Sequence, residues 1–187
     1  RNLTKAEIVE QIFQAEKEGY PISNLVFMGM GEPLLNYDNV FAGIDALQSP
    51  ETFNISKRKV TVSTSGYLQH IKRLEKEERW INLAFSVGSA VPKIRQTIMP
   101  IEKRNPIVEV ARHIASYQKQ HNRKLTLEYT LLEGKNDSEF EINQLANLAL
   151  YLNAKVNLIN LNPHAKIPFK PVSNNKLAQI KNQLTQL

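Results

Sequence analysis

The stretch VFMGMGEPLLN, residues 26–36, decides the fold of this sequence. A short apolar run ends abruptly at Gly29 and Gly31, and Glu32 and Pro33 follow directly. A glycine after a strand often serves only a tight turn. Two glycines, however, let another group approach the backbone closely, and the proline stiffens the exit of the chain. We therefore interpret this stretch as a buried strand followed by a ligand-binding loop, with Glu32 at its rim.

Outward from this loop, strand and helix patterns alternate along the chain. Apolar and β-branched runs predict five strands, at residues 24–28, 58–66, 80–88, 124–132 and 155–163. Apolar residues at helical spacing predict helices before the first strand and after each strand, one of them at residues 68–76. Capping boxes at Thr4–Glu7 and Ser138–Glu141 mark two helix starts, and residues 98–106 are predicted to be a loop.

This order of elements predicts the fold class. Five strands joined by helical crossovers indicate an α/β protein with a parallel sheet, either doubly wound or an open, incomplete barrel. No linker or low-complexity run interrupts the pattern, so we expect residues 1–187 to form one domain.

The carboxyl ends of the predicted strands carry small or polar residues. Because parallel α/β proteins bind ligands at this edge of the sheet, the convergence indicates one shared site. Taken singly, a serine or asparagine there often only caps the next helix. The strand ends carry the sequences GMGEP (29–33), STSG (63–66), SVGS (86–89), EY (128–129) and NLNP (160–163).

Composition limits the classes of function. The 187 residues have ordinary hydrophobic and charged content, no membrane-length apolar run and no signal-like start, so we expect a cytoplasmic protein without a membrane partner. A formal charge of +6, with basic clusters such as residues 57–59 and 123–124, favours polyanionic partners, although solvated faces explain the same charge. The absence of cysteine excludes thiolate metal sites and cysteine nucleophiles within the chain.

Several common sites are absent from the pattern. Leu34 stands where a dinucleotide fingerprint needs its third glycine, and neither a Walker A sequence nor a nucleophile elbow occurs. Glu109 and His113 share a helix face, but no further residue is spaced to complete a metal site. We expect no metal ligands in this chain.

Taken together, the motifs resemble a known family. The blocks GMGEPLLN (29–36), RKVTVSTSG (58–66), LAFSV (83–87) with IRQTIMPI (94–101), LTLEYTLLEGKNDS (125–138) and VNLINLNP (156–163) occur in order. They resemble the radical S-adenosylmethionine (SAM) methyltransferases that modify an adenosine of large-subunit rRNA, some also acting on tRNA. A related member confers antibiotic resistance. The resemblance implies an open βα barrel of the radical SAM type that lacks its first strand.

The resemblance also implies the binding residues and the cofactors. SAM would lie across the strand ends and contact seven positions: Gly31, Glu32, Ser63, Ser86, Val87, Gly88 and Asn162. Gly88 departs from the family, which has histidine there. The family's second cofactor is a [4Fe–4S] cluster, reduced by an electron donor. Its cysteine ligands, the methyl-carrying cysteine and the acid/base glutamate have no counterparts here, so we assign no catalytic residue in this chain.

Two explanations of the missing cysteines stay open. In the first, the chain is the core of a radical SAM RNA methyltransferase, cut at both ends, with the cluster ligands outside it. In the second, it is a degenerate relative that binds RNA without catalysis. A radical SAM enzyme with a substrate other than RNA is a third interpretation.

Overall fold

The structure, a computed structural model, describes residues 1–122, 125–165 and 167–186. One sheet contains all five strands in chain order, and every pair is parallel. The strands are β1 (Leu25–Phe27), β2 (Val60–Thr64), β3 (Asn82–Ser86), β4 (Leu125–Leu131) and β5 (Lys155–Asn160). The α-helices are α1 (Lys5–Lys17), α2 (Tyr37–Gln48), α3 (Leu68–Lys76), α4 (Pro92–Ile98), α5 (Ile107–His121), α6 (Glu139–Tyr151) and α7 (Asn174–Gln186).

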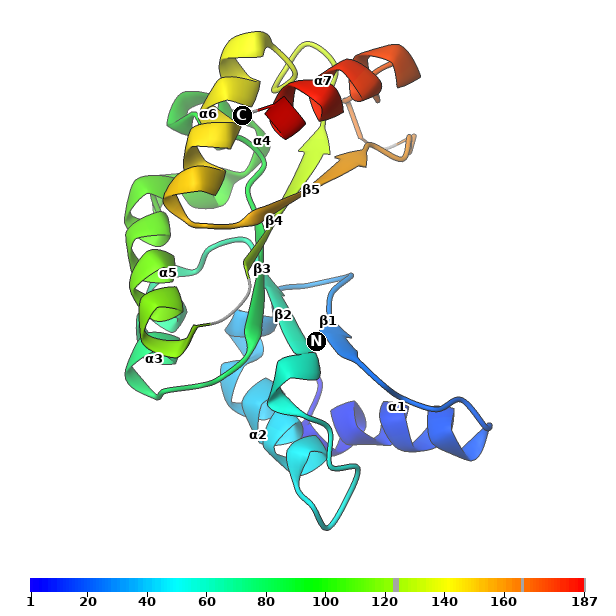
Figure 1. Cartoon of the computed structure of the whole chain (residues 1–187). Coiled ribbons are helices and arrows are strands. Elements are labelled where there is room, and N and C mark those ends of the chain that lie inside the picture. Colours follow the sequence, from blue (N-terminus) through cyan, green and yellow to red (C-terminus); the bar gives the residue numbers. More distant parts are fainter. Residues whose placement is uncertain (123–124, 166, 187) are drawn as a thin grey trace.

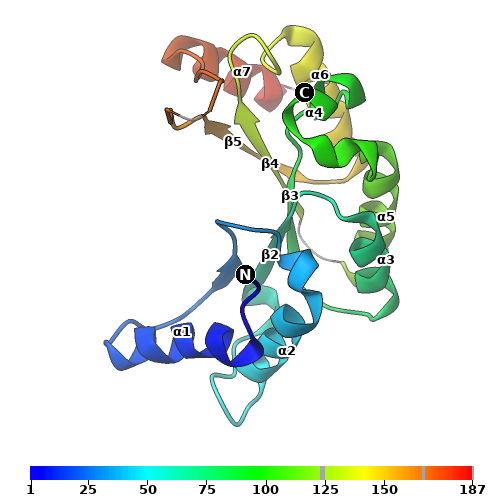
Figure 2. The ribbon, with the colours of Figure 1, turned by 180° about the vertical axis from the view of Figure 1, so that it is seen from behind.

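The sheet is open and curved. Figure 1 shows a crescent in which helices α2 to α6 cover the outer face, while α1 and α7 lie at its two ends. The view from behind in Figure 2 shows the same arrangement, with the inner face of the sheet left open. β1 and β5 are the two edges. The predicted α/β fold, an open barrel of parallel strands, is confirmed.

Alternation along each strand separates the core from the inner face. In β4, Leu127 and Tyr129 are buried, whereas Glu128 between them is partly exposed. Parallel register then aligns the inner-face residues into rows, of which one contains Ser86, Glu128 and Asn157. Since residues i and i+2 of a strand share a face, the outer face packs against the helices and the inner face is available for binding.

Most predicted elements lie where the sequence placed them, with differences at their ends. The fourth strand was expected over residues 124–132. The structure gives Leu125–Leu131, and Lys124, like Arg123 of the basic cluster, lies outside the described residues. The prediction of a loop at residues 98–106 was wrong in part, because the 3₁₀ helix η3 (Pro100–Lys103) occupies it. α4, directly before it, was not predicted.

The two expected capping boxes differ. At α1, Thr4 and Glu7 form both hydrogen bonds of the motif. At α6, the Ser138 hydroxyl accepts from the Glu141 amide at 3.2 Å, but the Glu141 carboxylate accepts from the Ser89 hydroxyl at 2.6 Å. Glu141 therefore ties α6 to the loop after β3 instead of completing the box.

Candidate functional site

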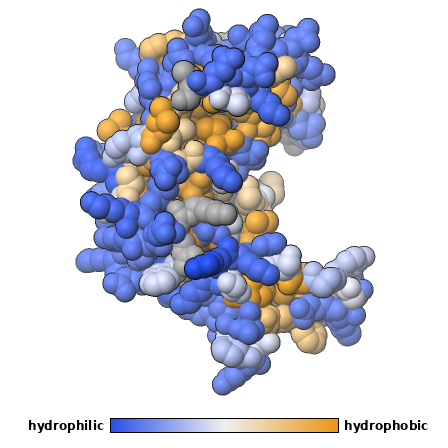
Figure 3. Space-filling model, in the orientation of Figure 1, coloured by the Kyte–Doolittle hydropathy of each residue, from blue (hydrophilic) through white to orange (hydrophobic). Residues whose placement is uncertain are grey.

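Two adjoining clefts lie over the carboxyl ends of the strands. The first, of about 490 Å³, extends from α1 along β1 to the loop at residues 29–33. The second, of about 390 Å³, extends toward β4 and β5. Met28, Gly29, Ser63 and Ser86 line both clefts, so the two form one continuous hollow. Figure 3 shows apolar residues gathered along the inside of the crescent, beside polar ones.

The loop after β1 depends on its glycines for conformation. Gly29 and Gly31 have φ angles of +119° and +96°, which L-residues with side chains rarely adopt. A Cβ atom built on either glycine would meet no heavy atom within 4 Å. Glycine is thus required here by the backbone and not by crowding, and the loop presents bare backbone to the hollow.

The carboxylate of Glu32 fastens this loop to the next one. Its Oε1 accepts from the Leu34 amide at 3.1 Å. Its Oε2 accepts from the Ser65 amide at 2.8 Å and from the Ser65 hydroxyl at 2.7 Å. Hydrogen bonds to a carboxylate are about twice as strong as neutral ones. Glu32 lines the cleft, but its oxygens brace the loops after β1 and β2.

Ser63 and Ser86 form the centre of the floor. Both lie on the inner face of the sheet, on β2 and β3, and both are partly exposed. The carboxylate of Glu128 lines the second cleft beside Ser86 in the register and accepts from the Asn157 amide at 2.7 Å. The floor therefore presents two hydroxyls and one oriented carboxylate.

The remaining predicted contacts lie in different places. Val87 is buried; its amide donates to the Glu128 carbonyl at 3.0 Å and its carbonyl accepts from Arg95 Nε at 2.8 Å. It lines neither cleft, and its polar backbone groups are already used within the protein. Asn162 is exposed beyond β5 and also lines neither cleft.

Gly88 lines the second cleft, and Met99 occupies the space next to it. Its φ angle is +69°, and a Cβ atom there would lie 2.5 Å from the Met99 sulfur. The histidine that the family resemblance would place at this position would require the flexible Met99 side chain to shift. Met99 itself lines the cleft, so a thioether forms part of the wall beside Gly88.

A buried ion pair that sequence reasoning missed supports the floor from below. Arg95 is 0% exposed, and its Nη1 donates to Glu102 Oε2 at 2.6 Å. Its other nitrogens donate to the Val87 and Ser65 carbonyls at 2.8 and 2.7 Å. Burial lowers the pKa of Arg95, while Glu102 opposes that shift. One side chain thus connects the loops after β2 and β3 with α4 and η3.

A second buried group fixes the loops after β3 and β4. The Asn136 amide donates to the carbonyls of Gly88 and Thr130, at 2.7 and 2.9 Å, and its oxygen accepts from the Leu132 amide at 2.8 Å. The Tyr129 hydroxyl donates to the Asn136 carbonyl at 2.8 Å, and burial raises the pKa of Tyr129. With Glu32 and Arg95, these bonds join four successive strand-end loops and hold the site in one geometry.

This fold and site define the class of protein. The chain belongs to the radical SAM superfamily, whose family model matches residues 1–143. It is 40% identical over 176 residues to a probable dual-specificity RNA methyltransferase RlmN of Aquifex aeolicus, covering 91% of this chain and 51% of that protein. A dual-specificity RNA methyltransferase RlmN of Syntrophotalea carbinolica is 35% identical over 184 residues, covering 98% and 49%.

A solved structure gives the same result. The crystal structure of a radical SAM methyltransferase from Sphaerobacter thermophilus superimposes with a TM-score of 0.92 at 35% identity, over all of this chain and 56% of that one. The resemblance predicted from the motifs is confirmed. The chain spans about half the length of the curated relatives it matches.

Membership of this superfamily implies SAM and a [4Fe–4S] cluster as cofactors. Since the sequence contains no cysteine, thiolate ligands of a cluster lie outside this chain. Among the described residues, no three histidine, aspartate or glutamate side chains gather to hold a metal ion. No helix in the described part of the chain is long and apolar enough to cross a membrane.

Proposed function

We propose that this chain forms the SAM-binding core of a radical SAM enzyme that methylates an adenosine of RNA. The observation that carries the proposal is the placement of the 29–33 loop, Ser63 and Ser86 around one continuous hollow at the strand ends. Both named curated relatives are described as dual-specificity RNA methyltransferases, one of them as probable, which supports RNA as the substrate. The resemblance of the motifs points to rRNA, with tRNA as a second substrate.

The hollow suits SAM in size and in the chemistry of its lining. Small-molecule sites typically occupy about 300–1,000 Å³, with apolar walls and a few oriented polar groups. In this proposal, the backbone at Gly31 and Glu32 receives the methionyl end of SAM. The hydroxyls of Ser63 and Ser86 hold its polar middle. Met99, Ile159 and Phe169 form the apolar wall of the second cleft. SAM supplies the methyl group and, when cleaved reductively, a radical.

Two of the seven expected SAM contacts, Val87 and Asn162, lie outside the hollow. Val87 and Asn162 line neither cleft, so we assign Val87 to positioning the Gly88 loop and keep Asn162 as a predicted contact. The residues of this chain do not fit the cluster, because they include no thiolate. The cluster ligands, the electron donor and the acid/base group are accordingly proposed to come from outside residues 1–187.

A pair of matched variants tests SAM binding. Ser63→Leu fills the centre of the hollow, whereas Thr61→Leu adds the same side chain two residues earlier on the same face of β2, outside both clefts. Titration calorimetry should show SAM binding to the unchanged chain and to Thr61→Leu. We expect Ser63→Leu to lose at least about tenfold in affinity, or about 1.4 kcal/mol. SAM binding that is absent from the unchanged chain, or equal in both variants, contradicts the proposed site.

A second experiment separates an enzyme from a non-catalytic relative. The full-length protein that contains this chain would be reconstituted with iron and sulfide, reduced, and incubated with SAM and rRNA or tRNA. Mass spectrometry of the digested RNA should find one added methyl group on an adenosine. A protein that binds SAM and RNA but leaves the RNA mass unchanged supports the degenerate relative instead.

A further inference from the structure

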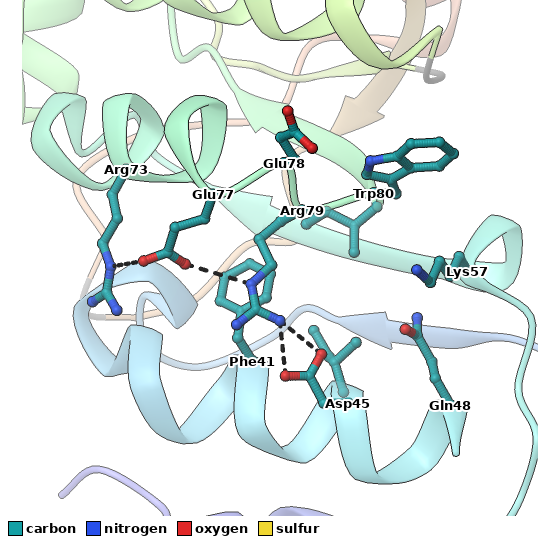
Figure 4. Close-up of a pocket in the computed structure, with 11 residues that line it drawn as sticks. Phe41, Asp45, Gln48, Lys57, Arg73, Glu77, Glu78, Arg79 and Trp80 are labelled. Carbon is teal, nitrogen blue, oxygen red and sulfur yellow. Dashed lines mark hydrogen bonds and ion pairs between the residues drawn. The ribbon is translucent and has the colours of Figure 1, made fainter. Parts of the chain in front are cut away.

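A separate hollow lies at the opposite end of the strands from the SAM site. It has a volume of about 420 Å³ and lies between α2 and the segments that lead into β2 and β3. Figure 4 shows Trp80 and Lys57 at its rim, with Gln48 reaching toward it from α2. It is lined by Phe41, Ile44, Asp45, Gln48, Lys57, Arg73, Glu77, Glu78, Arg79, Trp80 and Ile81.

A basic turn adjoins this hollow and contributes Lys57 to its lining. Lys57, Arg58 and Lys59 form the 3₁₀ helix η2 directly before β2, and all three are exposed. Within the described chain, none of the three forms an ion pair. By contrast, Arg73 and Arg79, which line the same hollow, are held by carboxylates at 2.6 to 2.7 Å.

The backbone of the basic turn is held by its neighbours. The Ser56 hydroxyl accepts from the Arg58 amide at 3.4 Å and begins the turn. The Asn82 amide donates to the Arg58 carbonyl at 2.8 Å and fastens η2 to the start of β3. The backbone of the turn is thus held at two points. Lys57 lies over Trp80 and Arg58 and Lys59 follow it in the chain, and we call these three residues the basic cluster.

Trp80 gives the cluster an aromatic surface. Trp80 is 48% exposed, Lys57 Nζ lies 5.7 Å from its ring centroid, and the His121 ring is tilted against it with the centroids 6.1 Å apart. An exposed cation–π contact contributes about 0.5–1 kcal/mol. A nucleic-acid base stacked on an aromatic side chain contributes about 1–3 kcal/mol. A base that displaces Lys57 from the Trp80 ring therefore gains more than the cation–π contact loses. The displaced Lys57 ammonium can then pair with a phosphate of the same strand.

We propose that Trp80 and the basic turn at Lys57, Arg58 and Lys59 form a docking site for single-stranded RNA, separate from the SAM hollow. One base stacks on Trp80 while the three cations contact neighbouring phosphates. The choice of RNA rests on the proposed function, whereas the site itself rests on the geometry.

The chain contains a single tryptophan, so base stacking can be measured directly. Oligoadenylate of about ten nucleotides, within the range of single-strand site sizes, would be titrated into the chain while Trp80 fluorescence and the anisotropy of a labelled oligonucleotide are recorded. We expect quenching that saturates together with the anisotropy. Three phosphate contacts predict an affinity about 20-fold weaker at 200 mM than at 50 mM salt, from a slope of about 0.7 per contact.

Two triple variants with the same charge change provide the control. Lys57→Gln/Arg58→Gln/Lys59→Gln should abolish most of the salt dependence and the quenching. Lys5→Gln/Lys17→Gln/Lys181→Gln removes three exposed helix lysines elsewhere and should retain both. Anisotropy without quenching, or equal losses in the two triple variants, overturns the docking site. SAM calorimetry on the same samples tests the SAM site independently, so the two proposals can fail separately.

Discussion

Replacing Glu102 by glutamine tests whether the buried ion pair organises the strand-end loops. Glu102 is 6% exposed, and its carboxylate accepts from Arg95 and from the Ile107 amide, which begins α5. Glutamine has nearly the same shape and retains an oxygen for the Ile107 amide. It removes the negative charge and turns one acceptor oxygen into an NH₂ donor, so Arg95 stays buried without a counter-ion.

The expected magnitude follows from that burial. Removing one partner of a buried ion pair costs about 3–5 kcal/mol, because the other charge is left uncompensated. Arg95 keeps its hydrogen bonds to the Ser65 and Val87 carbonyls, which favours the lower half of that range. A domain has a total stability of about 5–15 kcal/mol, so Glu102→Gln should remove a fifth or more of it. Arg95→Met combined with Glu102→Gln should recover part of the loss.

Urea unfolding followed by far-ultraviolet circular dichroism and by Trp80 fluorescence measures this loss. The control is Glu109→Gln, which breaks the exposed Glu109–Arg112 pair and should cost less than about 1 kcal/mol. Below the unfolding transition, Glu102→Gln should also weaken SAM binding, because Arg95 positions two loops beside the hollow. A stability loss equal to that of the control would refute the structural role of the buried pair.

Three further predictions concern the loop, the pH dependence and the sheet edge. Gly31→Ala should cost about 1–3 kcal/mol in urea unfolding, because φ is +96° and no new contact compensates; an unchanged midpoint would contradict this. Burial alone would raise the pKa of Glu75, but hydrogen bonds from Ser116 and His113 outweigh it and the pKa is lowered. That contribution to stability is complete above the unfolded pKa, near 4.5, and is lost as pH falls through the lower folded pKa. Glu75→Gln should therefore reduce the fall in the free energy of unfolding over this acidic pH range. Equal slopes of stability against pH in the unchanged protein and in Glu75→Gln would exclude the effect. The unpaired edge of β1, with apolar residues exposed beside it, predicts self-association, which a concentration-independent monomer in sedimentation would disprove.

The order of elements was predictable because it depends on local signals. Apolar periodicity and capping residues are read within one helix or strand, and α3 begins and ends at the predicted residues. The strand-end glycines and serines were predictable for a related reason: parallel topology brings every carboxyl end to one edge of the sheet. Gly31, Glu32, Ser63, Ser86 and Gly88 accordingly line the hollow.

The groups that brace the site were not predictable in this way. A charged residue such as Arg95 is expected on the surface, and only its three-dimensional partners explain why it is fully buried. Asn136 likewise looks like an ordinary turn residue, yet it bonds the loops after β3 and β4. The only sequence signal for Arg95 was its place in the block IRQTIMPI, which is one of the motifs of the family resemblance. The resemblance gave this arginine no role.

The two proposed binding surfaces lie at opposite ends of the same strands, and this separation has a kinetic consequence. β2 has five residues, so its ends are about 13 Å apart at about 3.3 Å per residue. Substitutions that far apart and without shared partners act almost additively. RNA held at Trp80 would raise the effective concentration of a target adenosine near the SAM hollow without touching the reacting atoms. In the full-length enzyme, the triple change at Lys57, Arg58 and Lys59 should therefore raise KM for RNA and leave kcat and SAM affinity unchanged. A fall in kcat at saturating RNA would show instead that the basic turn acts on the chemistry.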